Sequence, residues 1–255
     1  MELLAFDTLD STNLEARRRW NQRNLGGRHD PLLIVARTQS GGLGRAGRNW
    51  LSPPGGLWMS LAWALKDDLE EYQAAPLLAG LATAEAIEDV CDVACQIKWP
   101  NDVLVRQRKL VGILCQGEPD LPVPAIILGI GVNANFASED LGAGLRHPPI
   151  SIQDMLGRPI DLDALRDGIA GNLARYLANL EEDPIVLGAM LIRRIEERLA
   201  WSGQEVRCSD VQGHVLASGI LEGLTAEGCA MIMTTGGLET LAIGELQLRP
   251  GAEES

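Results

Sequence analysis

The sequence has few cysteines, no long apolar run and little concentrated positive charge, and each shortage excludes a class of protein. Its five cysteines are scattered and odd in number, which favours reduced thiols over a disulfide framework or a metal site. No apolar run approaches the ~20 residues needed to cross a bilayer. The chain also starts without the basic segment of a signal peptide. We therefore expect a cytoplasmic protein with no membrane partner.

The net charge is strongly acidic. The chain has 35 Asp and Glu against 22 Lys and Arg, a formal charge of −13. Nucleic acids and anionic membranes bind through concentrated positive charge, so neither is an expected partner. The basic residues that are present gather around residues 37–48 and 98–109. An anion is expected to bind at these two segments.

The apolar pattern predicts one large α+β domain followed by a small β-domain. Strands are expected at residues 3–6, 32–36, 57–65, 96–99, 110–115 and 125–132. Helices are expected after residue 13 and at residues 74–93, 163–180 and 184–199. Beyond residue 202, short strand-like pieces at 205–208, 214–220, 230–234 and 238–242 are typical of a small β-barrel. We expect a mixed β-sheet with helices packed on one face in residues 1–202, and the barrel in residues 203–255.

The sharpest motif is the loop at residues 40–50, Ser-Gly-Gly-Leu-Gly-Arg-Ala-Gly-Arg-Asn-Trp. Its glycines let the backbone approach a ligand, and successive free N–H groups in such a loop can bind an anion. Arg45 and Arg48 add donors suited to phosphate or carboxylate, and Trp50 offers a face for a base to stack on. The loop is not a P-loop, because Gly-Arg-Asn stands where Gly-Lys-Ser/Thr is needed. Taken alone, the pattern also fits a surface loop with solvated arginines.

Four further motifs stand in order around this loop. Residues 11–13 read Ser-Thr-Asn, residues 98–102 Lys-Trp-Pro-Asn-Asp, residues 108–113 Arg-Lys-Leu-Val-Gly-Ile and residues 129–133 Gly-Ile-Gly-Val-Asn. Together with the loop, they closely resemble the biotin–protein ligases (biotin–[acetyl-CoA-carboxylase] ligases). The resemblance is strong over residues 7–135, and the C-terminal part matches the family's SH3-like domain only in general texture. It implies a catalytic domain like that of lipoate ligases and class II aminoacyl-tRNA synthetases.

The resemblance also implies the reaction. An enzyme of this family activates biotin with ATP to biotinyl-5′-AMP, and then passes biotin to a lysine of a biotin carboxyl carrier protein or domain. Mg²⁺ is expected with the ATP phosphates, and no carboxylate cluster indicates a metal site held by protein alone. The Ser-Thr-Asn motif begins at residue 11, so we expect no DNA-binding winged helix ahead of it. The oligomeric state stays open, a homodimer included.

The resemblance further assigns substrate contacts. Those expected for biotin are Ser11, Thr12, Asn13, Gln39, Gly42, Leu43, Gly44, Arg45, Lys109, Gly112, Gly129 and Gly131. Those expected for ATP are Arg48, Trp50, Lys98, Asn101, Lys109 and Asn133. The buried ureido head of biotin needs polar partners, and glycines let strands approach a ligand. Ser11 and Thr12 could instead cap the helix that follows them.

The expected catalytic residues are Lys109, Arg45, Arg48 and Asp102. The reaction joins a carboxylate to the α-phosphorus of ATP, so fixed cations must offset the repulsion of two anions. Lys109 is the expected bridge between them. The acceptor lysine must lose a proton before it attacks. Asp102 either orients or deprotonates that lysine, or only stabilises the turn beside Asn101.

One residue departs from the family pattern. The loop usually reads Gly-Arg-Gly-Arg-x-Gly-Arg, and Leu43 stands in place of its first arginine. In the family that arginine helps to fold the loop over the adenylate, so its charge is missing here. Two alternatives remain: a lipoate–protein ligase, and a non-catalytic biotin sensor or acyl-adenylate binding protein. The Lys-Trp-Pro-Asn-Asp motif with the Trp-ended loop favours biotin over lipoate.

Overall fold

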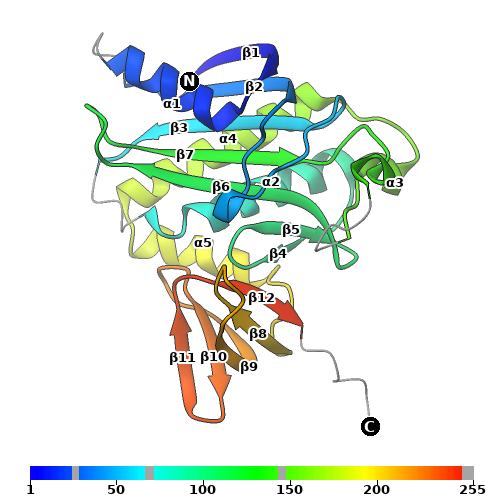
Figure 1. The fold of residues 1–255 in the computed structure, drawn as a ribbon. Coiled ribbons are helices and arrows are strands. Elements are labelled where there is room, and N and C mark those ends of the chain that lie inside the picture. Colours follow the sequence, from blue (N-terminus) through cyan, green and yellow to red (C-terminus); the bar gives the residue numbers. More distant parts are fainter. Residues whose placement is uncertain (25–28, 67–71, 143–147, 249–255) are drawn as a thin grey trace.

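The computed structural model describes residues 1–24, 29–66, 72–142 and 148–248. Its centre is a seven-stranded mixed sheet (Figure 1). Its order is β1 (Glu2–Leu9), β2 (Leu32–Gln39), β3 (Leu57–Ala64), β7 (Ala125–Val132), β6 (Arg108–Glu118), β5 (Asp102–Val105) and β4 (Gln96–Lys98). Strands β1 and β2 pair in parallel, and the other neighbours are antiparallel. This sheet confirms the expected α+β fold class.

Helices cover the two faces of the sheet unequally. The main layer consists of α2 (Ala75–Cys91), α4 (Leu162–Glu182) and α5 (Val186–Glu196), whereas α1 (Thr12–Asn24) lies on the other face (Figure 1). Alternation along β2 explains this, since successive side chains point to opposite faces. Leu33 belongs to the core that contains α2 and α4, whereas Leu32 and Ile34 pack with Trp20 of α1. The expected helical layer is therefore present, and α1 covers the face that we expected to lack helices.

Helix α4 shows how the sequence sets these elements. The Asp161 carboxylate accepts hydrogen bonds from the N–H groups of Asp163 and Ala164, which satisfies two free donors at the helix start. Its buried residues include Leu165, Ile169, Leu173, Leu177 and Leu180, which recur at helical spacing. The apolar stripe that they form belongs to the same core as α2.

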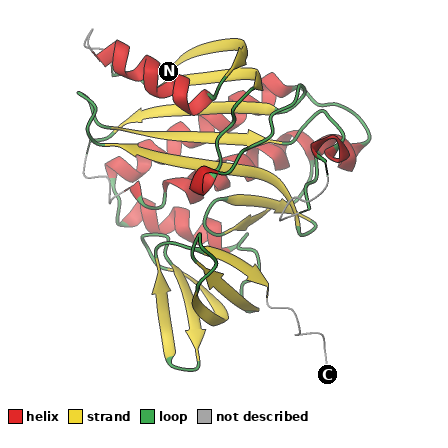
Figure 2. Cartoon of the chain, in the orientation of Figure 1, coloured by secondary structure: helices red, strands yellow, loops and turns green. Residues whose placement is uncertain are grey.

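The C-terminal unit is a five-stranded antiparallel sheet (Figure 2). Its order is β11 (Gly237–Leu241), β10 (Ala230–Thr234), β9 (Val215–Leu224), β8 (Glu205–Ser209) and β12 (Glu245–Leu248). This sheet confirms the expected C-terminal β-structure of an SH3-like domain. Its buried side chains, Leu221 and Ile232 among them, join the core of the main sheet, and Trp99 Nε1 donates to the carbonyl of Gly228 (3.0 Å). The two sheets are therefore packed firmly together.

The sequence did not predict several short elements. They are β5, β12, the helix α3 (Ile152–Leu156) and the 3₁₀ turns Arg45–Gly47 and Ser138–Leu141. Helix α3 had a readable signal, because Ser151 and Asp154 form a capping box and Gly157 ends the helix at φ 66°.

The structure bears on two of the exclusions made from composition. All five cysteines are free thiols, and burial raises the pKa of Cys95 and Cys115 to about 12. These thiols therefore stay protonated and unreactive at neutral pH. Within the described ranges, no helix has the length and hydropathy needed to cross a membrane.

Candidate active site

A cavity of about 210 Å³ lies between the 40–50 loop, the start of α1 and strands β6 and β7. All the predicted site residues except Gly42 and Lys98 line it. Apolar side chains that were not among the predicted contacts also line it: Leu51, Met59, Ile113, Leu114, Ile130, Leu141 and Pro149. The fold therefore brings segments that are far apart in the sequence, from Ser11 to Glu245, around one space with apolar and charged parts.

The start of α1 brings polar groups to this cavity. Gln39 Oε1 accepts hydrogen bonds from the N–H (2.8 Å) and the hydroxyl (3.1 Å) of Thr12. Gln39 Nε2 donates to Ser52 Oγ at 2.7 Å. The Ser60 hydroxyl lies within hydrogen-bond distance of Thr12 Oγ1 (2.7 Å) and Asn13 Oδ1 (2.6 Å). These bonds fix the directions in which Thr12, Asn13 and Gln39 present their polar atoms.

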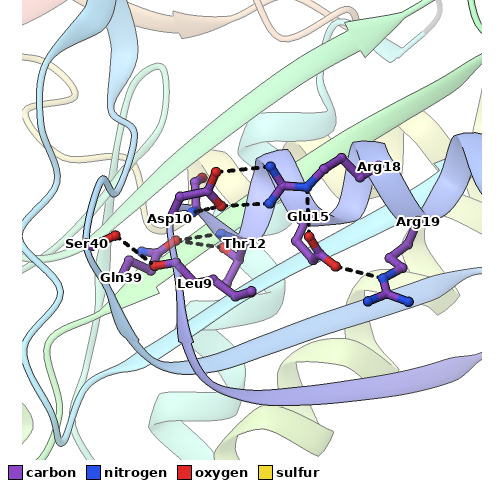
Figure 3. A network of polar contacts seen from close by, with 9 residues as sticks. Leu9, Asp10, Thr12, Glu15, Arg18, Arg19, Gln39 and Ser40 are labelled. Carbon is purple, nitrogen blue, oxygen red and sulfur yellow. Dashed lines mark hydrogen bonds and ion pairs between the residues drawn. The ribbon is translucent and has the colours of Figure 1, made fainter.

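A second network holds the same turn from its outer side (Figure 3). The Asp10 carboxylate accepts hydrogen bonds from the Ser11 N–H (2.7 Å) and from two nitrogens of Arg18 (2.7 and 3.0 Å). Glu15 accepts from Arg18 at 2.8 Å and from Arg19 at 2.7 Å. The hydrogen bond from the Arg18 guanidinium lowers the pKa of Asp10 to about 2. The position of Ser11 is therefore fixed by its hydrogen bond to Asp10, which Arg18 holds in place.

Glycines form the floor of the cavity, and Trp50 lies over it. A Cβ atom at Gly112 would come within 2.6 Å of the Trp50 ring, and one at Gly131 within 2.5 Å. A Cβ at Gly129 would lie 2.1 Å from Asn13 Oδ1. Strands β6 and β7 can therefore carry only glycine at these positions while Trp50 and Asn13 stay in place.

Two buried polar atoms in the cavity wall have no hydrogen-bond partner within the described part of the chain. They are Trp50 Nε1 and Asn133 Oδ1. Such groups are rare in folded proteins, because an unmade hydrogen bond in a buried place costs free energy. A bound molecule with a polar group near these atoms would remove that cost.

The charged part of the cavity contains more cations than anions. Lys109 Nζ lies 2.6 Å from Asp102 Oδ1 and 5.2 Å from the centre of a Trp50 ring. An Arg45 Nη atom donates to Asn101 Oδ1 (3.1 Å) and to the carbonyl of Gly244 (3.2 Å). Burial lowers the pKa of Arg45, although the nearby carboxylates oppose this effect and a guanidinium remains protonated in proteins.

Arg48 is the third cation that lines the cavity, and the two carboxylates that line it are those of Asp102 and Glu245. In a chain with a net charge of −13, this local excess of positive charge is suited to an anionic ligand.

Two predicted contacts do not line the cavity. The carbonyl of Gly42 accepts from the Trp50 N–H (2.8 Å), so Gly42 shapes the loop. Lys98 is buried at the end of β4, 3.6 Å from Asp102 and 3.9 Å from Glu245. Glu245 itself, at the start of β12, lines the cavity and was not predicted, because no motif surrounds it in the sequence.

Comparisons with known proteins agree with this site. Residues 5–133 match the model of the biotin/lipoate A/B protein ligase family. A biotin–[acetyl-CoA-carboxylase] ligase of Paracoccus denitrificans is 31% identical over 247 residues, 93% of this chain and 96% of that protein. A bifunctional ligase/repressor of Bacillus subtilis is 30% identical over 250 residues, 96% of this chain and 74% of that protein.

A solved structure supports the same assignment. Biotin protein ligase from Aquifex aeolicus, in complex with biotin and ATP, matches with a TM-score of 0.80 and 26% identity, over 98% of this chain and 99% of that chain. The present chain belongs to the biotin/lipoate A/B protein ligase family.

Proposed function

We propose that this protein is a biotin–protein ligase, which condenses biotin with ATP and then transfers biotin to a lysine of a carboxyl carrier protein or domain. The observation that carries the proposal is the place of Lys109. Its ammonium lies 5.2 Å from a Trp50 ring centre, in the cavity that Arg45 and Arg48 also line. The Paracoccus relative and the Aquifex structure named above support biotin and ATP as the substrates. In this proposal residues 1–202 form the catalytic domain and residues 203–255 an appended domain, of which residues 249–255 lie outside the described structure.

In the first step, the ureido head of biotin would bind Ser11, Thr12 and Gln39, whose directions are already fixed. The tetrahydrothiophene ring and the valeryl chain of biotin would lie on the glycine floor beside Trp50, which excludes water from them. The carboxylate would then point to Lys109. The glycines let Trp50 and Asn13 lie directly against strands β6 and β7, where any side chain would displace them.

The carboxylate oxygen attacks the α-phosphorus of ATP, and the bond to the pyrophosphate oxygen breaks, so that pyrophosphate leaves. Lys109 and Arg45 would offset the negative charge of both reactants and hold them in line. Arg48, Asn101 and Asn133 would contact the nucleotide, and the unpaired Oδ1 of Asn133 is an acceptor for one of its N–H or O–H groups.

Mg²⁺ would arrive with ATP, its main ligands being phosphate oxygens. Among the residues that the structure describes, no group of three or more His, Cys, Asp or Glu could hold a metal. In this proposal Mg²⁺ is part of the nucleotide substrate.

In the second step, the amine of the acceptor lysine attacks the acyl carbon and AMP leaves. The amine must first lose a proton, since a lysine is protonated at neutral pH. Asp102 is held by Lys109 at 2.6 Å. Asp102 has two possible roles. It can leave Lys109 and accept a proton from the incoming ammonium, or it can keep its ion pair and only orient Lys109.

The test is incubation with biotin, MgATP and a carboxyl carrier domain, followed by mass spectrometry of the acceptor. We expect the mass of one biotinyl group on a lysine, and pyrophosphate release when the acceptor is omitted. Transfer of lipoate in place of biotin would make the protein a lipoate ligase. Tight binding of biotinyl-5′-AMP without pyrophosphate release from biotin and ATP would make it a non-catalytic binding protein.

A further inference from the structure

Five charged side chains of alternating sign form a continuous chain beside the cavity. Arg48 lies 3.5 Å from Glu245, and Glu245 lies 3.9 Å from Lys98. Lys98 lies 3.6 Å from Asp102, and Asp102 lies 2.6 Å from Lys109. The two end members, Arg48 and Lys109, line the cavity. The chain therefore connects the two cations that would meet ATP and biotin.

The deepest member is Lys98, whose side chain is only 1% exposed and whose ammonium lies 5.5 Å from the Trp201 ring centre. A buried ammonium is costly unless carboxylates compensate for its lost hydration. Here one carboxylate, Asp102, comes from the main sheet and the other, Glu245, from the C-terminal sheet. Lys98 thus ties the two sheets together without lining the cavity.

The C-terminal sheet touches the loop at a second point. The carbonyl of Gly244, the residue before Glu245, accepts a hydrogen bond from Arg45 at 3.2 Å. Both arginines of the 40–50 loop are thus in contact with consecutive residues of the C-terminal unit. Of the described residues of that unit, Glu245 alone lines the cavity.

We infer that Lys98 and Glu245 are positioning residues, through which the docked C-terminal sheet holds Lys109 and Arg48 in place for the reaction. Each carboxylate in the chain bridges two cations, so it cannot shift toward one without leaving the other. If Glu245 loses its charge, Lys98 is drawn toward Asp102, and the hold of Asp102 on Lys109 weakens. Arg48 is released at the same time. The catalytic consequence of this inference rests on the proposed function, whereas the structural coupling does not.

The coupling is testable without substrates by hydrogen exchange of the full chain. The variant is Glu245→Gln, and its matched control is Glu222→Gln, the same change on an exposed position of β9 that does not line the cavity. We expect faster exchange at β12, at the 44–50 loop and around residue 109 in Glu245→Gln alone. Equal exchange in the two variants would overturn the inference. Unchanged exchange in α4, on the far side of the main core, verifies that the variants are folded.

The consequence for the reaction is measured as pyrophosphate release from biotin and MgATP without acceptor. We expect Glu245→Gln and Lys98→Met each to lower kcat about ten- to a hundredfold, because a misplacement of about 1 Å can cost about a hundredfold. KM for ATP should change little in Lys98→Met, which leaves the Arg48–Glu245 pair in place. The double variant should lose no more than the worse single variant, because both act through one chain.

A rise in KM for ATP with kcat unchanged in Lys98→Met would mean that Lys98 binds the nucleotide directly, and would overturn the inference. Fully additive losses in the double variant would do the same. If Lys98→Met does not fold, the comparison of Glu245→Gln with Glu222→Gln decides alone. A parent protein that releases no pyrophosphate would remove the proposed function, and the exchange measurement would still judge the coupling.

Discussion

The two sheets contribute to one cavity in different ways. The main sheet and its loops supply nearly all the lining side chains, most of them in five segments that each carry a recognisable motif. The C-terminal sheet supplies one lining side chain, Glu245, and one backbone carbonyl, that of Gly244. Residues that contact a ligand need particular chemistry at particular spacing, which makes them visible as motifs. Residues that support other residues need only a charge or a carbonyl in the right place, which leaves no pattern.

The strongest test of this contrast is Lys109→Ala. If Lys109 bridges the carboxylate and the α-phosphate, its removal should slow the reaction far more than loss of the Glu245 charge. Glu245 acts on Lys109 only through Lys98 and Asp102. We expect adenylate formation to fall by two to three orders of magnitude, about 3–4 kcal/mol, as for loss of a single catalytic donor. Folding should change little, since Lys109 is partly exposed. The measurement is pyrophosphate release, with the thermal midpoint as the folding control.

Lys109→Arg separates charge from shape. A planar guanidinium keeps the charge but cannot occupy the place of a compact ammonium, so we expect only partial recovery. Full activity in Lys109→Arg would mean that charge alone suffices, and parent-like rates in Lys109→Ala would remove this residue from the mechanism.

The glycine floor belongs wholly to the main sheet, and Gly131→Ala tests it. The new Cβ would lie 2.5 Å from Trp50 Nε1, so Trp50 must move. Overpacking of this kind costs about 1–3 kcal/mol, and we expect KM for biotin or ATP to rise about tenfold or more. Gly171→Ala in α4 is the matched control, because its Cβ meets nothing within 4 Å. That change should leave kinetics intact and stabilise the helix by up to about 1 kcal/mol. Equal kinetics in both variants would contradict the assigned role of the floor.

The sequence predicted the main sheet well and the C-terminal sheet only in outline, for physical reasons. Strand alternation and helical periodicity located the long elements, because burial on one face repeats along them. Strand β5 was hidden, since it begins at Asp102 inside a motif that ends the preceding turn. Strand β12 is four residues long, with too few positions to show a period.

The cavity residues likewise divide into those that the sequence predicted and those that it did not. The motifs identified nearly every wall of the cavity. They predicted that Lys98 contacts the nucleotide, and the structure places Lys98 outside the cavity lining, near Asp102 and Glu245. Pairing partners of a buried charge are set by tertiary packing, and nothing in the local sequence encodes them. Glu245 was missed for the same reason.

A smaller effect is expected at Leu43 of the 40–50 loop. Leu43 lines the cavity and pairs with Asn49 across the loop. Leu43→Arg adds a cation at the mouth of an anion site. We expect pyrophosphate release to stay at the parent rate and the adenylate to dissociate about two- to fivefold more slowly, consistent with about 0.5–1 kcal/mol for a solvent-exposed ion pair. Leu43→Met controls for side-chain length, and dissociation is followed by chasing labelled adenylate with unlabelled adenylate. Equal dissociation from Leu43→Arg and Leu43→Met would show that charge at this position does not matter.

The smallest effect is expected far from the C-terminal sheet, at the Arg18–Asp10 pair on the outer side of α1. Asp10 has its pKa lowered from 3.8 to about 2, chiefly by the hydrogen bond from Arg18. A carboxyl with a lower pKa in the folded state stabilises the fold above pH ~4, and this stabilisation is lost as pH falls from about 4 to about 2.

Because both side chains are nearly half exposed, at 47% and 48%, solvent screening reduces the contribution to about 0.2–1 kcal/mol. Arg18→Gln should therefore lower the urea midpoint slightly at about pH 6, and the difference from the parent should shrink near pH 3. Arg37→Gln, whose pair with Asp7 is longer at 3.5 Å and more exposed, is the control and should show almost no change at either pH. A loss in Arg18→Gln that is the same at both pH values would mean that Arg18 stabilises the turn by packing, independently of the Asp10 charge.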